Sequence, residues 1–197
     1  ENISLEQELF VPRPPTFCTG CPHRGFFYEL GKKRKKIVVA GDIGCYSLAV
    51  GEPYNMMDWI ICMGASFSSA HGAQKIFDMN PDENRRLVSI MGDSTFFHTG
   101  INSLLNTIYN KGNTINIILD NRITGMTGQQ DNPGSGKDLQ KEVTEIMDIE
   151  KIVRALGIKH VRRINPNDLQ ANKDTINWAL DLDEASVIIT DWPCKLK

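Results

Sequence analysis

Short apolar runs alternate along the chain with segments of helical spacing. Six runs of four to six residues, rich in β-branched side chains, lie at 37–40, 59–62, 86–91, 115–120, 159–162 and 187–190. Between most of them, apolar residues recur three or four positions apart, as at Ile101, Leu104, Leu105 and Ile108. Strands that alternate with helices are typical of βαβ units. The pattern predicts a three-layer α/β/α domain around a mostly parallel sheet that is covered on both faces.

Two segments break this rhythm. Residues 1–16 contain a Pro-rich run that disfavours helix, so we expect an extended arm there and the folded domain over 17–197. The chain opens at Glu1 without a Met, from which we expect a fragment of a longer subunit. Residues 121–138 lack apolar periodicity and contain repeated Gly and Pro. Loops of that length in compact domains are usually functional, and this one follows a predicted strand, at the edge where parallel sheets bind ligands.

The composition argues against several function classes. The 22 Lys and Arg residues nearly balance the 24 Asp and Glu residues, so the chain has no broad basic surface for nucleic acid. The one basic run, Lys32–Lys36, has no interleaved aromatic residues and reads as a solvated helix end. No apolar stretch approaches the ~20 residues that span a bilayer. Because no charged-then-apolar leader opens the chain, we expect a cytoplasmic protein without nucleic-acid or membrane partners.

A pair of polar segments predicts a magnesium site. Gly92-Asp93-Ser94 ends one predicted strand and opens a helix, whose free N–H groups suit a phosphate. One helix and one strand later, Asp120-Asn121 returns to the same sheet edge. The Asp93 carboxylate, the Asn121 amide oxygen and the Ile123 carbonyl would supply half an octahedron for Mg²⁺, completed by diphosphate oxygens and a water. Each segment alone could be an ordinary turn, but their paired placement favours the metal site.

Four of the five cysteines are placed to meet at the same edge. Cys18 and Cys21 form a C-x-x-C on the arm, while Cys45 and Cys194 each follow a predicted strand. Four converging thiolates suit a [4Fe–4S] cluster or structural zinc, and metal chemistry alone does not choose between them. An odd cysteine count disfavours a disulfide framework. Cys62 lies in the apolar run 59–62, so we expect it to be buried as a small hydrophobic residue.

Together these segments resemble a known enzyme family. The Gly-Asp and Asp-Asn pair resembles the thiamine diphosphate signature, with Ser94 and Asp120 in place of its usual Gly and Asn. The whole set resembles the thiamine diphosphate domain of the 2-oxoacid:ferredoxin oxidoreductases, and the large (α) subunit of the indolepyruvate type most of all. The matching segments cover most of the chain in family order: 18–25, 41–46, 62–66, 91–100 and 119–128.

The resemblance implies a thiamine diphosphate-binding fold and assigns roles to individual residues. It implies Mg²⁺ on Asp93, Asn121 and the Ile123 carbonyl, and a [4Fe–4S] cluster on Cys18, Cys21, Cys45 and Cys194. Further cofactor contacts are implied for Gly92, Ser94, Thr95, Thr124, Gly125 and Thr127 around the diphosphate, for Ile43, Gly44, Cys45, Met63, Gly64 and Ala65 beside the rings, and for Met126 under the bent cofactor. His98 is the catalytic candidate, with a structural role as the alternative.

The implied reaction is oxidative decarboxylation of a 2-oxoacid, such as indolepyruvate or another arylpyruvate, to acyl-CoA and CO₂, with electrons passed through the cluster to ferredoxin. Coenzyme A, ferredoxin, a pyrimidine-binding domain with its activating glutamate, and a second subunit of an oligomeric enzyme are the implied partners. No Glu stands in a matching motif, so we expect the isolated chain to be inactive. Two alternatives stay open: a non-oxidative thiamine diphosphate decarboxylase subunit, and a zinc-stapled, non-catalytic interaction domain.

Overall fold

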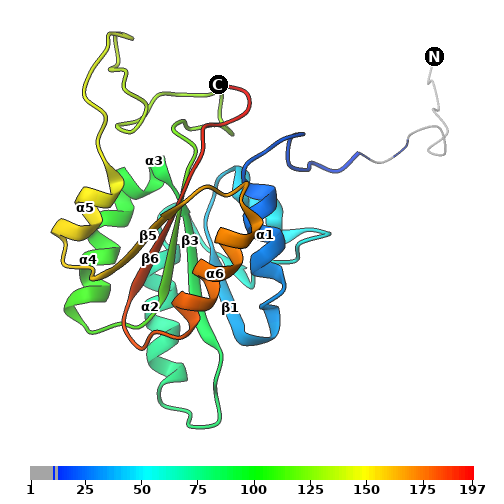
Figure 1. The fold of residues 1–197 in the computed structure, drawn as a ribbon, viewed down its shortest axis with the longest axis vertical. Helices are drawn as coiled ribbons and strands as arrows, with labels where there is room; N and C mark the ends of the chain where they lie inside the picture. The colour runs from blue at the N-terminus through cyan, green and yellow to red at the C-terminus, as the bar shows by residue number, and fades with distance from the viewer. Residues whose placement is uncertain (1–10, 12) are drawn as a thin grey trace, which may run out of the picture.

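The computed structural model describes residues 11 and 13–197, so most of the predicted arm lies outside the described residues (Figure 1). Its centre is a single six-stranded sheet, in the order β2-β1-β3-β4-β6-β5, in which every neighbouring pair is parallel. The strands are β1 (Ile37–Gly41), β2 (Trp59–Ile60), β3 (Arg86–Gly92), β4 (Ile115–Asp120), β5 (His160–Ile164) and β6 (Ser186–Asp191). The predicted α/β/α fold is therefore confirmed, with a sheet that is wholly parallel.

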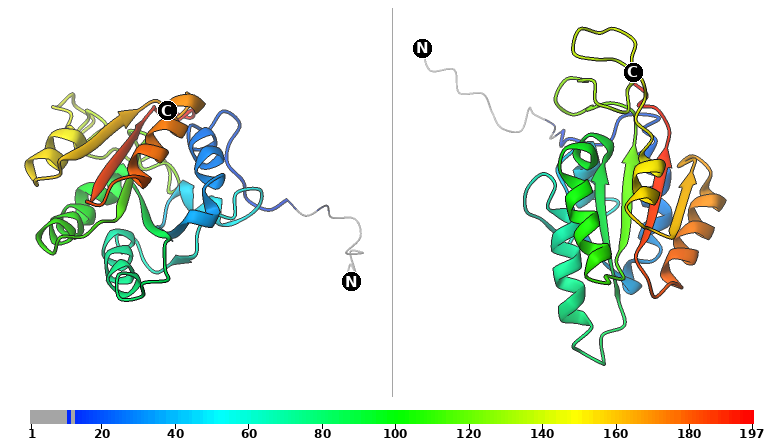
Figure 2. Two further views of the ribbon diagram at one scale, coloured as in Figure 1. Left: turned by 60° about the horizontal axis from the view of Figure 1, so that its bottom comes forward. Right: turned by 90° about the vertical axis from the view of Figure 1, so that its left-hand side faces the viewer.

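Helices cover both faces of the sheet (Figure 2). On one face, α1 (His23–Gly31) and α6 (Leu169–Leu180) pack side chains such as Phe27 and Ile176 against Val39 and Ile117. On the other face lie α2 (Ser66–Phe77), α4 (Ile101–Tyr109) and α5 (Ile149–Ala155). Because both faces are covered, β1 and β4 are buried at every position, which explains why β1 is a continuous apolar run and why four of the six residues of β4 are apolar.

The prediction for Cys62 was wrong. The strand there, β2, has only two residues and lies at the edge of the sheet, paired with β1 alone. The chain leaves the sheet after Ile60, and Cys62 is exposed together with Ile61. An apolar run at a sheet edge is covered on fewer sides than one in the middle, so its residues can reach the surface.

Two segments at the carboxyl edge set up the site. The helix predicted to open at Gly92-Asp93-Ser94 begins as α3 (Asp93–Thr95) and continues through a π-helical turn, η4 (Phe96–Gly100), into α4. The irregular segment after β4 is longer than predicted, since the next helix begins only at Ile149. It rises above the carboxyl edge of the sheet, near the C-terminus (Figure 2).

Among the described residues, no helix combines the length and the apolar character that crossing a membrane requires.

Candidate active site

The carboxyl ends of β1 and β3 flank a cavity of about 100 Å³. The chain runs from β1 outward to β2 and then back across to β3, so this crevice is the point where the strand order reverses, where open α/β sheets bind ligands. The lining comprises fourteen sequence-predicted site residues with Tyr46 and Leu119: Ile43, Gly44, Cys45, Met63, Gly92, Asp93, Ser94, Thr95, Asn121, Ile123, Thr124, Gly125, Met126 and Thr127.

Asp93 is the most constrained polar group in this cavity. Its carboxylate is 3% exposed and accepts hydrogen bonds from the Ser94 backbone N–H at 2.7 Å and from the Asn132 side-chain amide at 3.1 Å. Burial, reinforced by the neighbouring Asp120 carboxylate, raises the pKa of Asp93 to about 7. No Lys or Arg of the described chain forms an ion pair with Asp93. The site therefore has a buried acid without a counter-charge.

The other two predicted magnesium ligands follow β4. Asn121 is buried, and its side-chain oxygen accepts a hydrogen bond from the Ile123 backbone N–H at 3.2 Å. Arg122 between them adopts a left-handed backbone (φ 60°), and its guanidinium pairs with Asp191 on β6 at 2.6 Å. This turn places Asn121 and Ile123 in the lining of the cavity that Asp93 also lines.

Tyr46 is a site residue that the sequence analysis missed. Its ring is buried against the backbone of both loops: a Cβ built on Gly92 would lie 2.8 Å from the ring, and one on Gly44 would lie 2.4 Å from it. The hydroxyl donates to the Ile43 carbonyl at 3.0 Å. Tyr46 thus fixes how closely the segments after β1 and β3 approach each other, and only glycine fits where they meet it.

Gly64 and Ala65 do not line the cavity, in contrast to the sequence expectation. The Gly64 backbone N–H instead donates to both oxygens of the buried Asp42 carboxylate, at 3.0 and 2.9 Å, and the Ser66 N–H donates at 3.4 Å. These bonds hold the start of α2 beside the end of β1. Gly64 and Ala65 support the loop that carries Met63, and Asp42 is the organising residue, whose only sequence signal was its place in Gly41-Asp42-Ile43-Gly44.

His98 is not among the residues that line the cavity either. It is exposed within the π-helical turn, where its Nδ1 contacts the Thr99 hydroxyl.

The four predicted cluster cysteines, Cys18, Cys21, Cys45 and Cys194, line a second, smaller cavity of about 60 Å³. All are free thiols. Burial, together with the other three cysteines, raises the pKa of Cys21 to about 11, and a hydrogen bond from the His23 backbone N–H opposes that rise. Arg24 shapes the C-x-x-C turn, since its Nε donates to the Cys18 carbonyl at 3.0 Å. Across residues 11 and 13–197, no three or more His, Cys, Asp or Glu side chains form a group that could hold a metal ion.

The two cavities share a wall made of Cys45, Asn121 and Gly125. A Cβ on Gly125 would lie 3.4 Å from the Cys45 sulfur. The segment after β6 runs along the end of β4: the Cys194 N–H donates to the Asn121 carbonyl at 3.0 Å, and the Lys197 ammonium donates to the Arg122 carbonyl at 3.0 Å. A backbone hydrogen bond therefore joins Cys194, which lines the second cavity, to Asn121, which lines the first.

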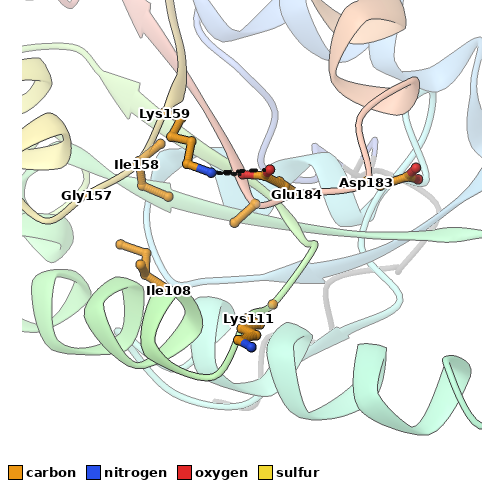
Figure 3. Close-up of a pocket in the computed structure, with 9 residues that line it drawn as sticks. Ile108, Lys111, Gly157, Ile158, Lys159, Asp183 and Glu184 are labelled. Atoms are coloured by element: carbon orange, nitrogen blue, oxygen red, sulfur yellow. Dashed lines mark hydrogen bonds and ion pairs between the residues drawn. The ribbon is translucent and has the colours of Figure 1, made fainter.

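A larger cavity, of about 420 Å³, lies at the amino-terminal edge of the sheet, since its lining includes residues just before β4, β5 and β6. The ends of α4 and α5 and the segment before β6 form it, and Lys159 pairs with Glu184 there at 3.0 Å (Figure 3). None of the sequence-predicted site residues lines it. Size alone therefore does not mark the functional cavity in this fold; position at the carboxyl edge does.

Fold and site together define a thiamine diphosphate-dependent enzyme domain. The chain belongs to the family described as "Thiamine pyrophosphate enzyme, C-terminal TPP binding domain", which matches residues 42–190. The resemblance inferred from the sequence is thereby confirmed at the level of the cofactor-binding domain.

Particular relatives narrow the class. The chain is 37% identical over 204 residues to indolepyruvate oxidoreductase subunit IorA of Methanothermobacter thermautotrophicus, with coverage of 98% of this chain and 32% of that protein. It is 38% identical over 205 residues to the IorA subunit of Pyrococcus horikoshii, with coverage of 100% of this chain and 32% of that protein. The chain thus spans about a third of the length of these curated relatives.

Solved structures show the same fold. A 2-oxoglutarate:ferredoxin oxidoreductase from Magnetococcus marinus superimposes with a TM-score of 0.76 at 18% identity, over 98% of this chain and 69% of that one. Benzoylformate decarboxylase from Polynucleobacter necessarius superimposes with a TM-score of 0.63 at 17% identity, over 100% of this chain and 36% of that one. At these identities the likeness concerns the fold.

Proposed function

We propose that this chain is the thiamine diphosphate-binding domain of a 2-oxoacid:ferredoxin oxidoreductase of the indolepyruvate type. The complete enzyme would convert an arylpyruvate and coenzyme A to acyl-CoA and CO₂ and pass the electrons through a [4Fe–4S] cluster to ferredoxin. The observation that carries the proposal is the wall shared by the cofactor cavity and the four-cysteine cavity. A one-electron carrier beside the cofactor serves ferredoxin-linked oxidation, whereas a non-oxidative decarboxylase has no use for it.

Asp93, Asn121 and the Ile123 carbonyl would hold Mg²⁺. The donor set fits a hard cation, because all three are oxygen ligands and Asp93 is a buried acid with no basic partner in the described chain. Asp93 is the only acidic ligand of the three, because Asn121 and Ile123 would contribute a neutral amide oxygen and a neutral backbone carbonyl. Ser94, Thr95 and Thr124 would contact the diphosphate. Bound thiamine diphosphate supplies the electron sink that decarboxylation of a 2-oxoacid requires.

Cys18, Cys21, Cys45 and Cys194 would hold the cluster. Because burial raises the pKa of Cys21 to about 11, binding of a metal there would release a proton from this thiol. A single zinc ion would need its sulfur ligands about 2.3 Å from one point. A four-iron cluster instead accepts four cysteines around a larger body, which suits thiols that surround a cavity.

The chain's own residues form one side of a site. The cofactor cavity, about 100 Å³, is smaller than the roughly 300–1,000 Å³ that is usual for small-molecule sites. Ile43, Met63 and Met126 around it remain 40–47% exposed. These apolar side chains leave a surface on which a pyrimidine-binding domain, with its activating glutamate, would complete the site. The isolated chain would therefore bind cofactor but not turn over substrate.

Calorimetric titration of the purified chain with thiamine diphosphate, with and without Mg²⁺, tests the cofactor part of this proposal. Binding is expected to require Mg²⁺, and Asp93→Ala is expected to weaken it at least tenfold. Asp82→Ala, which removes an exposed carboxylate from the segment before β3, at the opposite end of that strand from Asp93, serves as the matched control and should bind as wild type does. Binding that is independent of Mg²⁺, or unchanged in Asp93→Ala, would overturn the assigned metal ligands.

A further inference from the structure

Residues 131–147 form a long excursion above the cofactor cavity that has little core of its own. Leu139 and Val143 are 90% and 92% exposed, and the hydrogen bonds within the segment are local, such as that from the Thr144 N–H to the Gly136 carbonyl at 3.1 Å. Its internal ion pair joins Lys141 to Asp131 at 2.7 Å. The position of this segment therefore depends on what fastens it to the rest of the domain.

Within the described residues, a single hydrogen bond joins 131–147 to the rest of the chain: the Asn132 side-chain N–H donates to the Asp93 carboxylate at 3.1 Å. Both side chains are buried, at 7% and 3% exposure. The one polar attachment of the segment is thus made to the acid that the proposed function assigns to Mg²⁺, 39 positions earlier in the chain.

The orientation of the Asn132 amide is set by its other contact. Its side-chain oxygen accepts a hydrogen bond from the Gly134 backbone N–H at 2.8 Å, so the amide nitrogen must face Asp93. An amide N–H can donate to a carboxylate oxygen without adding charge, and it leaves further lone pairs of that carboxylate free for a cation. An aspartate at position 132 could not make this donor contact.

Packing strengthens the same attachment. A Cβ on Gly134 would lie 3.2 Å from the Phe97 ring, and Phe97 stands in the π-helical turn that follows Asp93. The turn that begins at Asn132 is therefore seated on the helix whose first residue is Asp93. Asp93, the helical segment that begins at it, and residues 131–147 are therefore in direct contact with one another.

We propose that Asn132 is a positioning residue of the metal site: its amide orients the Asp93 carboxylate and, through that contact, fastens residues 131–147 to the site. The proposal rests on the magnesium site of the proposed function. Because binding couplings are reciprocal, a cation that orders Asp93 should also order this segment, and loss of the fastening should weaken cation binding.

The test is a Mg²⁺ titration at saturating thiamine diphosphate, followed by amide hydrogen exchange of residues 131–147, in the purified chain. In wild type, Mg²⁺ is expected to increase protection of this segment. In Asn132→Ala, the Kd for Mg²⁺ should rise about tenfold and the increase in protection should disappear. Ser135→Ala is the matched control, because the Ser135 hydroxyl accepts from the Asn132 backbone N–H at 3.3 Å in the same turn without touching Asp93; its Mg²⁺ affinity should stay within about twofold of wild type.

Each alternative result has a defined meaning. Wild-type Mg²⁺ affinity and wild-type protection in Asn132→Ala would overturn this inference while leaving the proposed metal site intact. Equal weakening by Ser135→Ala would overturn it in favour of a role in turn structure only. A wild-type chain that binds no Mg²⁺ would overturn both this inference and the metal site. The thermal midpoint of Asn132→Ala should stay within a few degrees of wild type, since the residue lies outside the hydrophobic core.

Discussion

At the scale of single residues, the site depends on close approaches that leave room only for glycine. Gly92 has an ordinary extended backbone (φ −82°, ψ 164°), which alanine could adopt without strain. What excludes a side chain there is the buried Tyr46 ring, 2.8 Å from the position of a Cβ. The role of Gly92 is therefore to let the start of the helix at Asp93 lie directly on Tyr46.

Gly92→Ala should test this contact. Overpacking of a buried site costs about 1–3 kcal/mol, so the thermal midpoint should fall by several degrees, and thiamine diphosphate affinity should fall with it as the Asp93 helix is displaced. Gly72→Ala, in the middle of α2 with no atom near its added Cβ, is the control and should gain about 0.5–1 kcal/mol. An unchanged midpoint and affinity in Gly92→Ala, measured by scanning calorimetry and cofactor titration, would contradict the contact.

At the scale of elements, the strands and helices could be read from the sequence because tertiary packing agrees with the local pattern. The interior strand β1 is buried at every position and carries no polar side chain, so its sequence indicates its burial directly. The edge strand β2 lacks that cover, and Cys62 was misplaced for this reason.

Some residues of the candidate site could likewise be predicted from the sequence, and others could not. Asp93 and Asn121 follow strand ends and could be found by spacing, whereas Tyr46 and Asn132 act through contacts with residues far away in sequence. Without the fold, nothing in the local pattern around either residue marks such contacts. Asp42 is intermediate, because its Gly-Asp-Ile-Gly turn was visible but its attachment to α2 was not.

Asp42→Ala should destabilise the junction between β1 and α2. The fully buried carboxylate accepts from the backbone N–H groups of Ile43, Gly64 and Ser66, and each donor left unsatisfied costs about 1–3 kcal/mol. The free energy of unfolding should fall by about 3 kcal/mol or more in denaturant titrations. Asp168→Ala removes an exposed helix cap with one acceptor bond, to Ala171, and should cost only about 1 kcal/mol; equal effects of the two substitutions would refute the special role of Asp42.

At the scale of the whole molecule, the parallel sheet gathers distant parts of the chain at one edge. The end of β6 runs along the end of β4, so that the Cys194 backbone N–H donates a hydrogen bond to the Asn121 carbonyl. The cofactor cavity and the four-cysteine cavity are therefore adjacent. A [4Fe–4S] cluster in the four-cysteine cavity and thiamine diphosphate in the cofactor cavity would therefore lie next to each other. Under the proposed function, the partly exposed apolar residues at the cofactor cavity are where another domain would complete the site.

The purified chain alone is therefore expected to bind thiamine diphosphate without catalysing the reaction. Incubation with an arylpyruvate, coenzyme A and a viologen acceptor should give no reduction above background. The full-length subunit assembled with its second subunit should restore turnover under the same conditions. Turnover by the 197-residue chain alone would show that no second domain is needed.

The most direct test of the account is the iron, zinc and acid-labile sulfide content of anaerobically purified chain, measured with its visible spectrum. We expect about four iron and four sulfide per chain, lost in Cys45→Ser and retained in Cys62→Ser, because Cys62 is exposed outside the four-cysteine cavity. Stoichiometric zinc, no metal, or equal loss in both variants would contradict a ferredoxin-linked oxidoreductase and leave a thiamine diphosphate domain of another kind.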